Sequence, residues 1–82
     1  MSSTLSATVA ANARAIRARQ QRRQVDVAAA AGVSRTQLSV IESGNRLITV
    51  DDLLALCRGL GVGIMDLVAG GDESELRTLG LS

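Results

Sequence analysis

Apolar residues recur at spacings of three and four in the first part of the chain, as on one face of an amphipathic helix. The positions on this face are Leu5, Val9, Ala13, Ile16 and Gln20. They predict a first helix from about Ser6 to about Gln21, with Arg14 on the opposite side.

Two shorter helices follow, joined by a tight corner. The segment "QVDVAAAA" (24–31) is rich in alanine, the best helix former, and Gly32 stands where a left-handed C-terminal cap is expected. Ser34 is a good N-cap for the next segment, "RTQLSVIES" (35–43). This third helix turns Leu38 and Ile41 inward, and Gly44 ends it.

Two further helices are predicted after a connection over residues 45–49. Thr49 can cap the fourth helix, whose first turn carries Asp51 and Asp52, as the helix dipole favours. The apolar residues of the fourth helix are Leu53, Leu54, Leu56, Cys57 and Leu60, and those of a short fifth helix are Ile64, Met65, Leu67 and Val68.

We therefore predict an all-α fold, a compact five-helix domain over residues 9–69. Residues 1–8 form an N-terminal arm and the start of the first helix. Residues 70–82, "GGDESELRTLGLS", are predicted to be a tail that is either flexible or folded into one more helical turn around Leu76 and Leu79.

The composition removes several classes of function. The chain has no histidine, no aromatic residue and one cysteine, Cys57, inside the apolar run "LLALCRGL". We expect no zinc site, no cofactor, no enzymatic activity and no base stacking on aromatic side chains, and we interpret Cys57 as a core residue. No stretch reaches the roughly 20 apolar residues that span a bilayer, and the N-terminus lacks a signal-peptide pattern. A cytoplasmic, nucleoid-associated protein is the expectation.

Charge is unevenly distributed, although the net charge is only +1. Residues 1–46 hold seven arginines and two acidic residues, a net charge of +5, whereas residues 47–82 hold two arginines and six acidic residues, a net charge of −4. This polarity indicates that the first half meets an anionic partner. The alternative is a chance imbalance in a short chain.

The segment "QVDVAAAAGVSRTQLSVIE" (24–42) has the pattern of two helices that meet at a sharp corner. Ala28 is small enough for close helix contact, and Gly32 permits a positive φ. Apolar residues that can seal the two helices together are Val27, Ala31, Val33, Leu38 and Ile41. This arrangement is typical of a helix-turn-helix motif.

At this point the sequence resembles the Cro and lambda-repressor type, or XRE-like, family of helix-turn-helix proteins. The resemblance covers residues 9–69 and includes "ARAIR" (13–17), "QVDVAAAAGVSRTQLSVIESGNR" (24–46) and "VDDLLALCRGLGVGIMDLV" (50–68). It implies a sequence-specific transcriptional regulator that binds double-stranded DNA. It further implies a homodimer on a palindromic operator, joined through the fourth and fifth helices and possibly the tail, with no evident small-molecule effector.

The family resemblance assigns the third helix, about residues 35–43, to the major groove. The predicted base-reading residues are Arg35, Thr36, Ser39 and Val40. With Leu38 and Ile41 turned inward, short side chains form the outward face and Arg35 lies on its flank. There Arg35 can contact a guanine and Val40 a thymine methyl group. The alternative is an ordinary polar surface.

Contacts to phosphate are expected on both sides of this helix. The predicted residues are Gln24, Arg22, Arg23, Gln37, Ser43, Asn45 and Arg46. Such contacts fix register without reading sequence. For Asn45, simple turn chemistry is an equally good explanation.

The resemblance also implies a partly buried salt bridge between Arg17 and Glu42, joining the first and third helices. The corner between the first two helices departs from the family, which has a glycine, an apolar residue and a hydroxyl residue where this chain has Gln21, Arg22 and Arg23. The second helix therefore lacks its usual hydroxyl cap, at a cost of roughly 1 kcal/mol.

Other functions remain as alternatives to a regulator. The chain could be an antitoxin-type interaction module whose tail, "DESELRTLGLS" (72–82), binds a toxin. It could also bind nucleic acid without sequence preference, which would give steep salt dependence and no favoured site.

Overall fold

The computed structural model describes residues 4–82, so the first three residues of the predicted N-terminal arm lie outside the described chain. Within residues 4–82 there are six helices and no strand. They are α1 (Thr4–Arg19), α2 (Gln24–Ala31), α3 (Arg35–Ser43), α4 (Val50–Leu60), α5 (Ile64–Val68) and α6 (Glu73–Thr78). The all-α prediction is confirmed, and a sixth short helix follows the five that the periodicity predicts.

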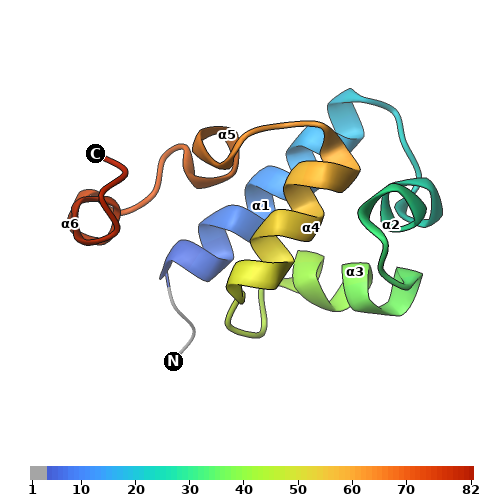
Figure 1. Ribbon diagram of the computed structural model, residues 1–82, viewed down its shortest axis with the longest axis horizontal. Helices are drawn as coiled ribbons and strands as arrows, with labels where there is room; N and C mark the ends of the chain where they lie inside the picture. Colours follow the sequence, from blue (N-terminus) through green and yellow to red (C-terminus); the bar gives the residue numbers. More distant parts are fainter. Residues whose placement is uncertain (1–3) are drawn as a thin grey trace.

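The core lies between α1 and the helices that surround it (Figure 1). Its largest fully buried side chains are Leu38, Leu56, Leu67, Val9, Val27 and Val68. Helix α4 crosses α2 at Gly59, where a Cβ atom would lie 2.9 Å from the Cβ of Ala31 and from the carbonyl oxygen of Val27. Only glycine permits this approach, so Gly59 sets the distance between α2 and α4.

The helix ends follow the predicted capping chemistry. Ser34 Oγ accepts a hydrogen bond from the Gln37 amide at 3.0 Å, and Gln37 Oε1 accepts one from the Ser34 amide at 2.9 Å. Thr49 and Asp52 form the same reciprocal pair at the start of α4. Gly32 ends α2 in the left-handed conformation, with φ of 76°. These caps fix the boundaries of the helix-turn-helix segment.

Helix α1 ends at Arg19, two residues before the predicted boundary at about Gln21. Gln21 has φ of 55° and is the one non-glycine residue in the left-handed region among residues 4–82. The family pattern has glycine at this position, and the chain makes the same turn with a glutamine. A glutamine in this conformation carries backbone strain, which a glycine would not.

The residues flanking this corner hold it to the far end of α4. Gln20 Nε2 donates to the Leu60 carbonyl at 2.8 Å, and Arg22 Nη1 donates to the Gly59 carbonyl at 2.6 Å. Both carbonyls belong to the last turn of α4, where helical partners are missing and positive charge is favoured. The corner is thereby fixed without the apolar residue that the family has at position 22.

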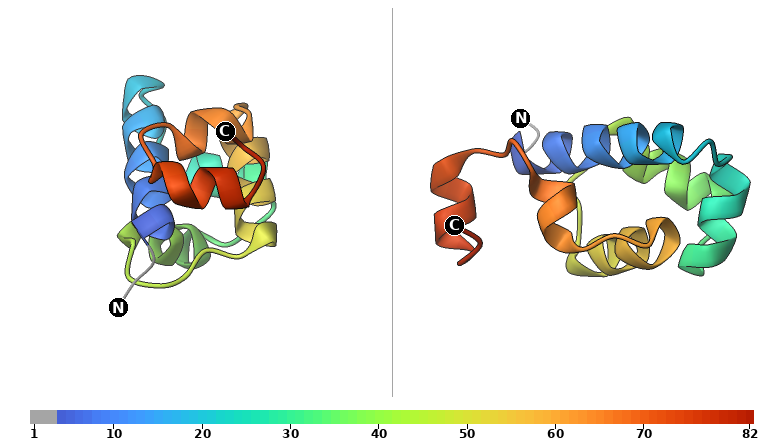
Figure 2. Two further views of the ribbon diagram at one scale, coloured as in Figure 1. Left: turned by 90° about the vertical axis from the view of Figure 1, so that its left-hand side faces the viewer. Right: turned by 90° about the horizontal axis from the view of Figure 1, so that it is seen from above.

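The tail is helical over α6 and is attached by few contacts. Leu76 and Leu81 pack against the core, but no residue of α6 is fully buried. Figures 1 and 2 show α6 at one end of the long axis and α2 at the other. The molecule measures 34 × 24 × 19 Å, so the tail lies far from the corner between α2 and α3.

Replacing Gln21 with glycine is expected to stabilise the fold. The change removes left-handed strain of about 1–2 kcal/mol but adds flexibility to the unfolded chain, which costs about 0.5–1 kcal/mol, so a net gain of about 0.5–1 kcal/mol is expected. Urea unfolding followed by circular dichroism measures this gain.

Gly61→Gln is the matched reverse substitution for this measurement. Gly61 has φ of 69°, and a Cβ atom added to it would meet nothing within 4 Å beyond its chain neighbours. In the folded protein the substitution therefore adds backbone strain without a clash. Destabilisation by Gly61→Gln and stabilisation by Gln21→Gly are expected together. A loss of stability in Gln21→Gly would contradict the strain at this corner.

Candidate nucleic-acid interface

The outward face of α3 carries four exposed side chains that line one shallow hollow: Arg35, Thr36, Ser39 and Val40. Capping by Ser34 and burial of Leu38 and Ile41 fix the rotation of the helix that turns this face outward. The polar groups of Arg35, Thr36 and Ser39 form no side-chain hydrogen bond within residues 4–82. Their hydrogen-bonding capacity is therefore available to a partner.

The N-terminus of α2 lies beside this face. Its N-cap is Arg23, whose side chain does not cap the helix. A second shallow hollow at this end is lined by Arg17, Arg23, Gln24, Val25 and Arg35. Arg35 lines both hollows, so the start of α2 and the outward face of α3 form one continuous surface. Free amide groups at an uncapped helix start favour an anion, and the arginines add positive charge there.

A buried carboxylate lies directly beneath this surface. Glu42 is 3% exposed, and its Oε2 lies 2.8 Å from Arg17 Nε while its Oε1 lies 2.9 Å from Arg17 Nη2. Gln24 Nε2 donates to the same Oε1 at 3.0 Å. The hydrogen bond to Glu42 raises the pKa of the Arg17 guanidinium. This cluster joins α1, α2 and α3.

The cluster leaves Gln24 only partly available to phosphate. One hydrogen of its side-chain amide is used by Glu42, which fixes the side chain in place. A second amide hydrogen and the backbone N–H at the start of α2 remain for an anion. The contact to Glu42 therefore orients Gln24 at the edge of the surface.

Arg14 has a structural role that the sequence did not predict, because its Nη1 donates to the backbone carbonyl of Glu42. This carbonyl lies in the last turn of α3, where a positive charge is favoured. The sequence did contain an indication of this contact. Arg14 and Arg17 are three residues apart, so they lie next to each other on the surface of one helix. Both arginines reach the C-terminal end of α3 from α1.

Arg22 joins the corner between α1 and α2 to the end of α4. Its Nη1 donates to the Gly59 carbonyl, and the Arg22 carbonyl accepts from Arg17 Nη1 at 3.1 Å. The hydrogen bond to Gly59 gives Arg22 a structural role at the end of α4. The predicted contact of Arg22 with phosphate stays a prediction.

Gln37 and Ser43 also use their side chains locally. Gln37 Oε1 belongs to the cap of α3, which leaves its amide nitrogen for other contacts. Ser43 Oγ donates to the Val40 carbonyl at 2.6 Å and accepts from the Asn45 amide at 3.2 Å. These bonds order the end of α3 and fix where Asn45 lies, while the Asn45 side chain stays exposed.

Arg46 and Asp52 form an ion pair that was not predicted from the sequence. Arg46 Nη1 lies 2.7 Å from Asp52 Oδ2, the same oxygen that accepts from the Thr49 amide at 2.9 Å. Burial acts to raise the pKa of the Asp52 carboxyl, but hydrogen bonds from Arg46 and Thr49 outweigh it and lower that pKa. Arg46 therefore stabilises the start of α4, and Asp52 partly neutralises the charge that Arg46 could offer to a phosphate.

Within residues 4–82, no group of three His, Cys, Asp or Glu side chains gathers as a metal site. Burial and the nearby Asp66 raise the pKa of the Cys57 thiol, so it stays protonated at neutral pH. None of the helices in this part of the chain is long and apolar enough to cross a bilayer.

Two short helices that meet at a tight corner, the second with an outward-facing polar side, form the helix-turn-helix arrangement of DNA-binding proteins. The family profile described as "Helix-turn-helix domain" matches residues 8–69, and the chain belongs to this family. Its fold is that of a DNA-binding transcription regulator and not of an enzyme, and double-stranded DNA is the partner that this fold implies.

Several solved structures of regulators are similar to this chain. A point mutant of the restriction-modification controller protein C.Esp1396I is 27% identical with a TM-score of 0.72, over 100% of this chain and 98% of that one. The clp gene regulator ClgR from C. glutamicum is 28% identical with a TM-score of 0.70, over 77% and 82% of the two chains. The hypothetical transcription factor NHTF from Neisseria is 26% identical with a TM-score of 0.71, over 90% and 84%. The comparison with curated proteins gave no match.

Removal of the Glu42 carboxylate is expected to destabilise the protein strongly. Glu42→Ala leaves Arg17 and Gln24 without their acceptor and should lower the free energy of unfolding by about 2–4 kcal/mol, because Arg17 is partly exposed and regains some hydration. Urea unfolding measures this loss. Asp26→Ala, which removes the exposed pair with Arg23, is the control and should unfold almost as the wild type does. A wild-type midpoint for Glu42→Ala would show that the cluster is not structural.

Stability is expected to fall in acid partly through Asp52. Its pKa is lower in the folded protein than the unfolded value of about 3.9, so its ionised form stabilises the fold above that pH and this contribution is lost as the pH falls through the folded pKa. Asp52→Asn, which keeps an oxygen for the Thr49 cap, should therefore flatten the decline below about pH 5 in a pH series of urea unfolding curves. Asp51→Asn removes one negative charge without affecting the pair with Arg46. Its stability should therefore decline more steeply in acid than that of Asp52→Asn. Equal slopes for the two variants would contradict the effect of this ion pair.

Proposed function

We propose that this protein is a sequence-specific transcriptional regulator that inserts α3 into the major groove of double-stranded DNA. Arg35, Thr36, Ser39 and Val40 are its base-reading residues. The observation that carries the proposal is that these four form one exposed surface whose polar groups have no partner within residues 4–82. Arg35 suits guanine O6 and N7, and the half-exposed Val40 suits a thymine methyl group.

We further propose that DNA phosphates are held on both sides of α3. On one side, a phosphate takes the place of the missing cap of α2, bound by its backbone amides with Gln24 and Arg23. The uncapped Arg23 position and the orientation of Gln24 by Glu42 support this contact. On the other side, the proposed contacts are those of Gln37, Ser43, Asn45 and Arg46. These interactions position the helix and carry no sequence information themselves.

The regulator is proposed to act as a homodimer on a palindromic operator. One α3 reads only a few base pairs, so two copies related by a two-fold axis are needed for a useful site length. The proposed contact is made by α4, α5 and the tail. It is supported by exposed apolar side chains on these elements, of which Val50, Leu54 and Met65 are examples. This surface shares no residue with the hollows at α2 and α3.

The antitoxin alternative depends on a tail that is available to bind a toxin. In this chain the tail forms α6, and Leu76 and Leu81 pack against the body of the same molecule. A tail engaged in this way favours the regulator over the interaction module.

Selection of bound sites from random duplex DNA tests the proposal. A palindromic consensus is expected, and Arg35→Ala should relax preference at one position of each half-site, with a loss of about 1–3 kcal/mol for the preferred base. Arg35 is exposed and has no partner in the fold, so the variant should unfold as the wild type does. Recovery of no consensus at moderate salt would remove the regulator from consideration.

Arg23→Gln provides the contrasting variant for the same selection. A phosphate contact adds affinity for all sequences alike, so the consensus should stay unchanged while every site is bound more weakly. The dependence of log K on log salt concentration should fall by about 1. A changed consensus in Arg23→Gln would contradict its assignment to phosphate.

A further inference from the structure

The last turn of α4 lies beside the corner between α1 and α2 and is bonded to it (Figure 1). The Gly59 carbonyl accepts a hydrogen bond from Arg22 Nη1 at 2.6 Å. Gly59 is also the residue whose lack of a side chain lets α4 approach Ala31 of α2. The end of α4 therefore has a fixed place against both the corner and α2, and Arg22 is bonded to that place.

The backbone of Arg22 is held from a second side. Its carbonyl accepts a hydrogen bond from Arg17 Nη1 at 3.1 Å, while the other two nitrogens of this guanidinium bind Glu42. Arg22 is thus bonded to α4 through its side chain and to the buried Glu42 cluster through its carbonyl. Two separate bonds fix the path by which the chain enters α2.

The residues directly after Arg22 form the proposed phosphate contact at the start of α2. Within residues 4–82, the backbone amides of Gln24 and Val25 have no acceptor, whereas the next two amides donate to the Arg23 carbonyl at 3.1 and 3.2 Å. Free amides at a helix start bind an anion only where they point at it, because hydrogen bonds weaken steeply with misalignment. The backbone that Arg22 holds sets their direction.

We propose that Arg22 is a positioning residue for DNA binding, which holds the start of α2 against the end of α4 and does not itself contact DNA. The proposal deepens the proposed function and rests on it. The apolar residue that the family has at this position could pack against α4 but could not donate a hydrogen bond to its carbonyl. The competing arrangement is a direct contact of Arg22 with phosphate, and the two arrangements differ in which phosphate depends on Arg22.

Operators in which one phosphate is replaced with an uncharged methylphosphonate test this role. In the wild type, replacement of the phosphate at the start of α2 should weaken binding about tenfold, because a charged hydrogen-bond acceptor is lost. Arg23→Gln identifies this phosphate as the one whose replacement then costs little further affinity. Arg22→Gln should weaken binding to the intact operator and make binding insensitive to replacement of that same phosphate. Its response to replacement of the other phosphates should match the wild type.

Two matched variants separate the effect of position from that of charge. Gln20→Ala removes the neighbouring bond to the Leu60 carbonyl without a change in charge, so it should reduce sensitivity to the same phosphate. Arg19→Gln removes a positive charge from an exposed side chain that has no partner within residues 4–82, so it should respond to every replacement as the wild type does. If circular dichroism shows that Arg22→Gln is unfolded, Gln20→Ala carries the test, and a wild-type response would then contradict the role.

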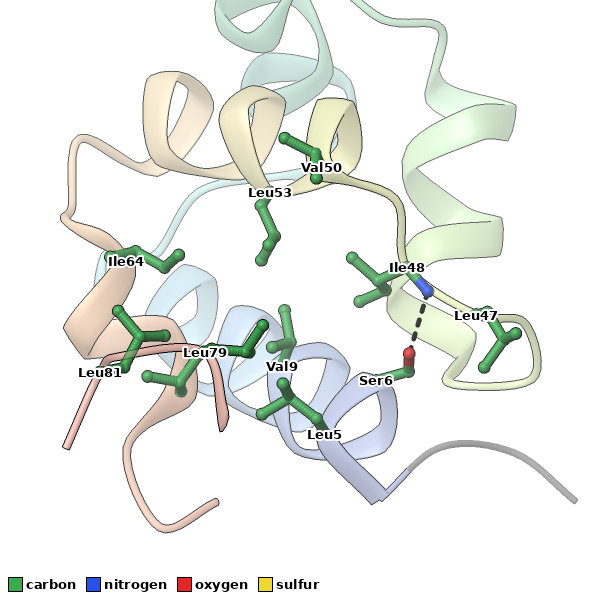
Figure 3. A pocket seen from close by; sticks show the side chains of 11 residues that line it. Leu5, Ser6, Val9, Leu47, Ile48, Val50, Leu53, Ile64, Leu79 and Leu81 are labelled. Carbon is green, nitrogen blue, oxygen red and sulfur yellow. Dashed lines mark hydrogen bonds between the residues drawn. The ribbon is translucent and has the colours of Figure 1, made fainter. Parts of the chain in front are cut away.

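The assembly state provides a control for a loss of affinity with another cause. Val50 and Leu53 at the start of α4 line an apolar hollow with α1, α5 and the tail (Figure 3), and no residue of the corner lines it. The surface proposed for dimerisation is therefore unchanged in Arg22→Gln. Sedimentation equilibrium should give the same assembly state as for the wild type. A loss of DNA affinity that comes only from weaker assembly would contradict the positioning role.

The remaining outcomes distinguish this inference from the proposed function. Wild-type affinity of a folded Arg22→Gln would overturn the positioning role. Insensitivity to a different phosphate from the one identified by Arg23→Gln would also overturn it, because Arg22 would then contact DNA directly. A wild type that selects no site, or that responds to no replacement, would overturn the proposed function instead.

Discussion

The structure depends on the buried carboxylate of Glu42. A charge removed from water is tolerated only when its oxygens are fully bonded, and here Arg17 and Gln24 supply three hydrogen bonds to it. Because these partners come from α1 and α2 while Glu42 belongs to α3, their geometry is satisfied by one arrangement of the three helices. Apolar packing between the three helices alone would permit small rotations of one helix against another. The carboxylate therefore fixes the angle at which α3 leaves the body, and with it the orientation of the outward face.

Some polar groups are hydrogen-bonded within the molecule, and the others remain available to a partner. The starts of α3 and α4 are closed by their own Ser34 and Thr49 caps, whereas α2 begins at Arg23 without a side-chain cap. The open helix start lies next to the outward face of α3, where the side chains of Arg35, Thr36 and Ser39 have no partner in the described chain. The proposed anion contact and the proposed base-reading face are thus brought side by side by the local sequence of two short helices.

The parts of this arrangement that depend on neighbours in sequence were predictable. The caps at Ser34 and Thr49 and the left-handed Gly32 follow from backbone requirements within a few residues. The ends of long flexible side chains were not predictable in this way. Arg22 reaches Gly59, 37 positions away, and Arg46 pairs with Asp52, because each finds an acceptor that only the folded chain brings near. Periodicity predicted α1 beyond Arg19, since apolar spacing says nothing about the turn made by Gln21.

The number of arginines in the sequence does not by itself indicate how many of them can contact DNA, because most of their partners in the fold are not predictable from the sequence. Of the seven arginines in residues 1–46, Arg17, Arg23 and Arg46 form ion pairs, and Arg14 and Arg22 are held by backbone carbonyls at helix ends. The charges held by carbonyls still contribute to the field that attracts DNA, but their positions are fixed by the fold. Many arginines therefore contribute to the long-range attraction of DNA, whereas few of them are available for direct contact with it. The proposed discrimination between DNA sequences falls to the short face of α3, where Arg35 is the one long side chain without a partner within residues 4–82.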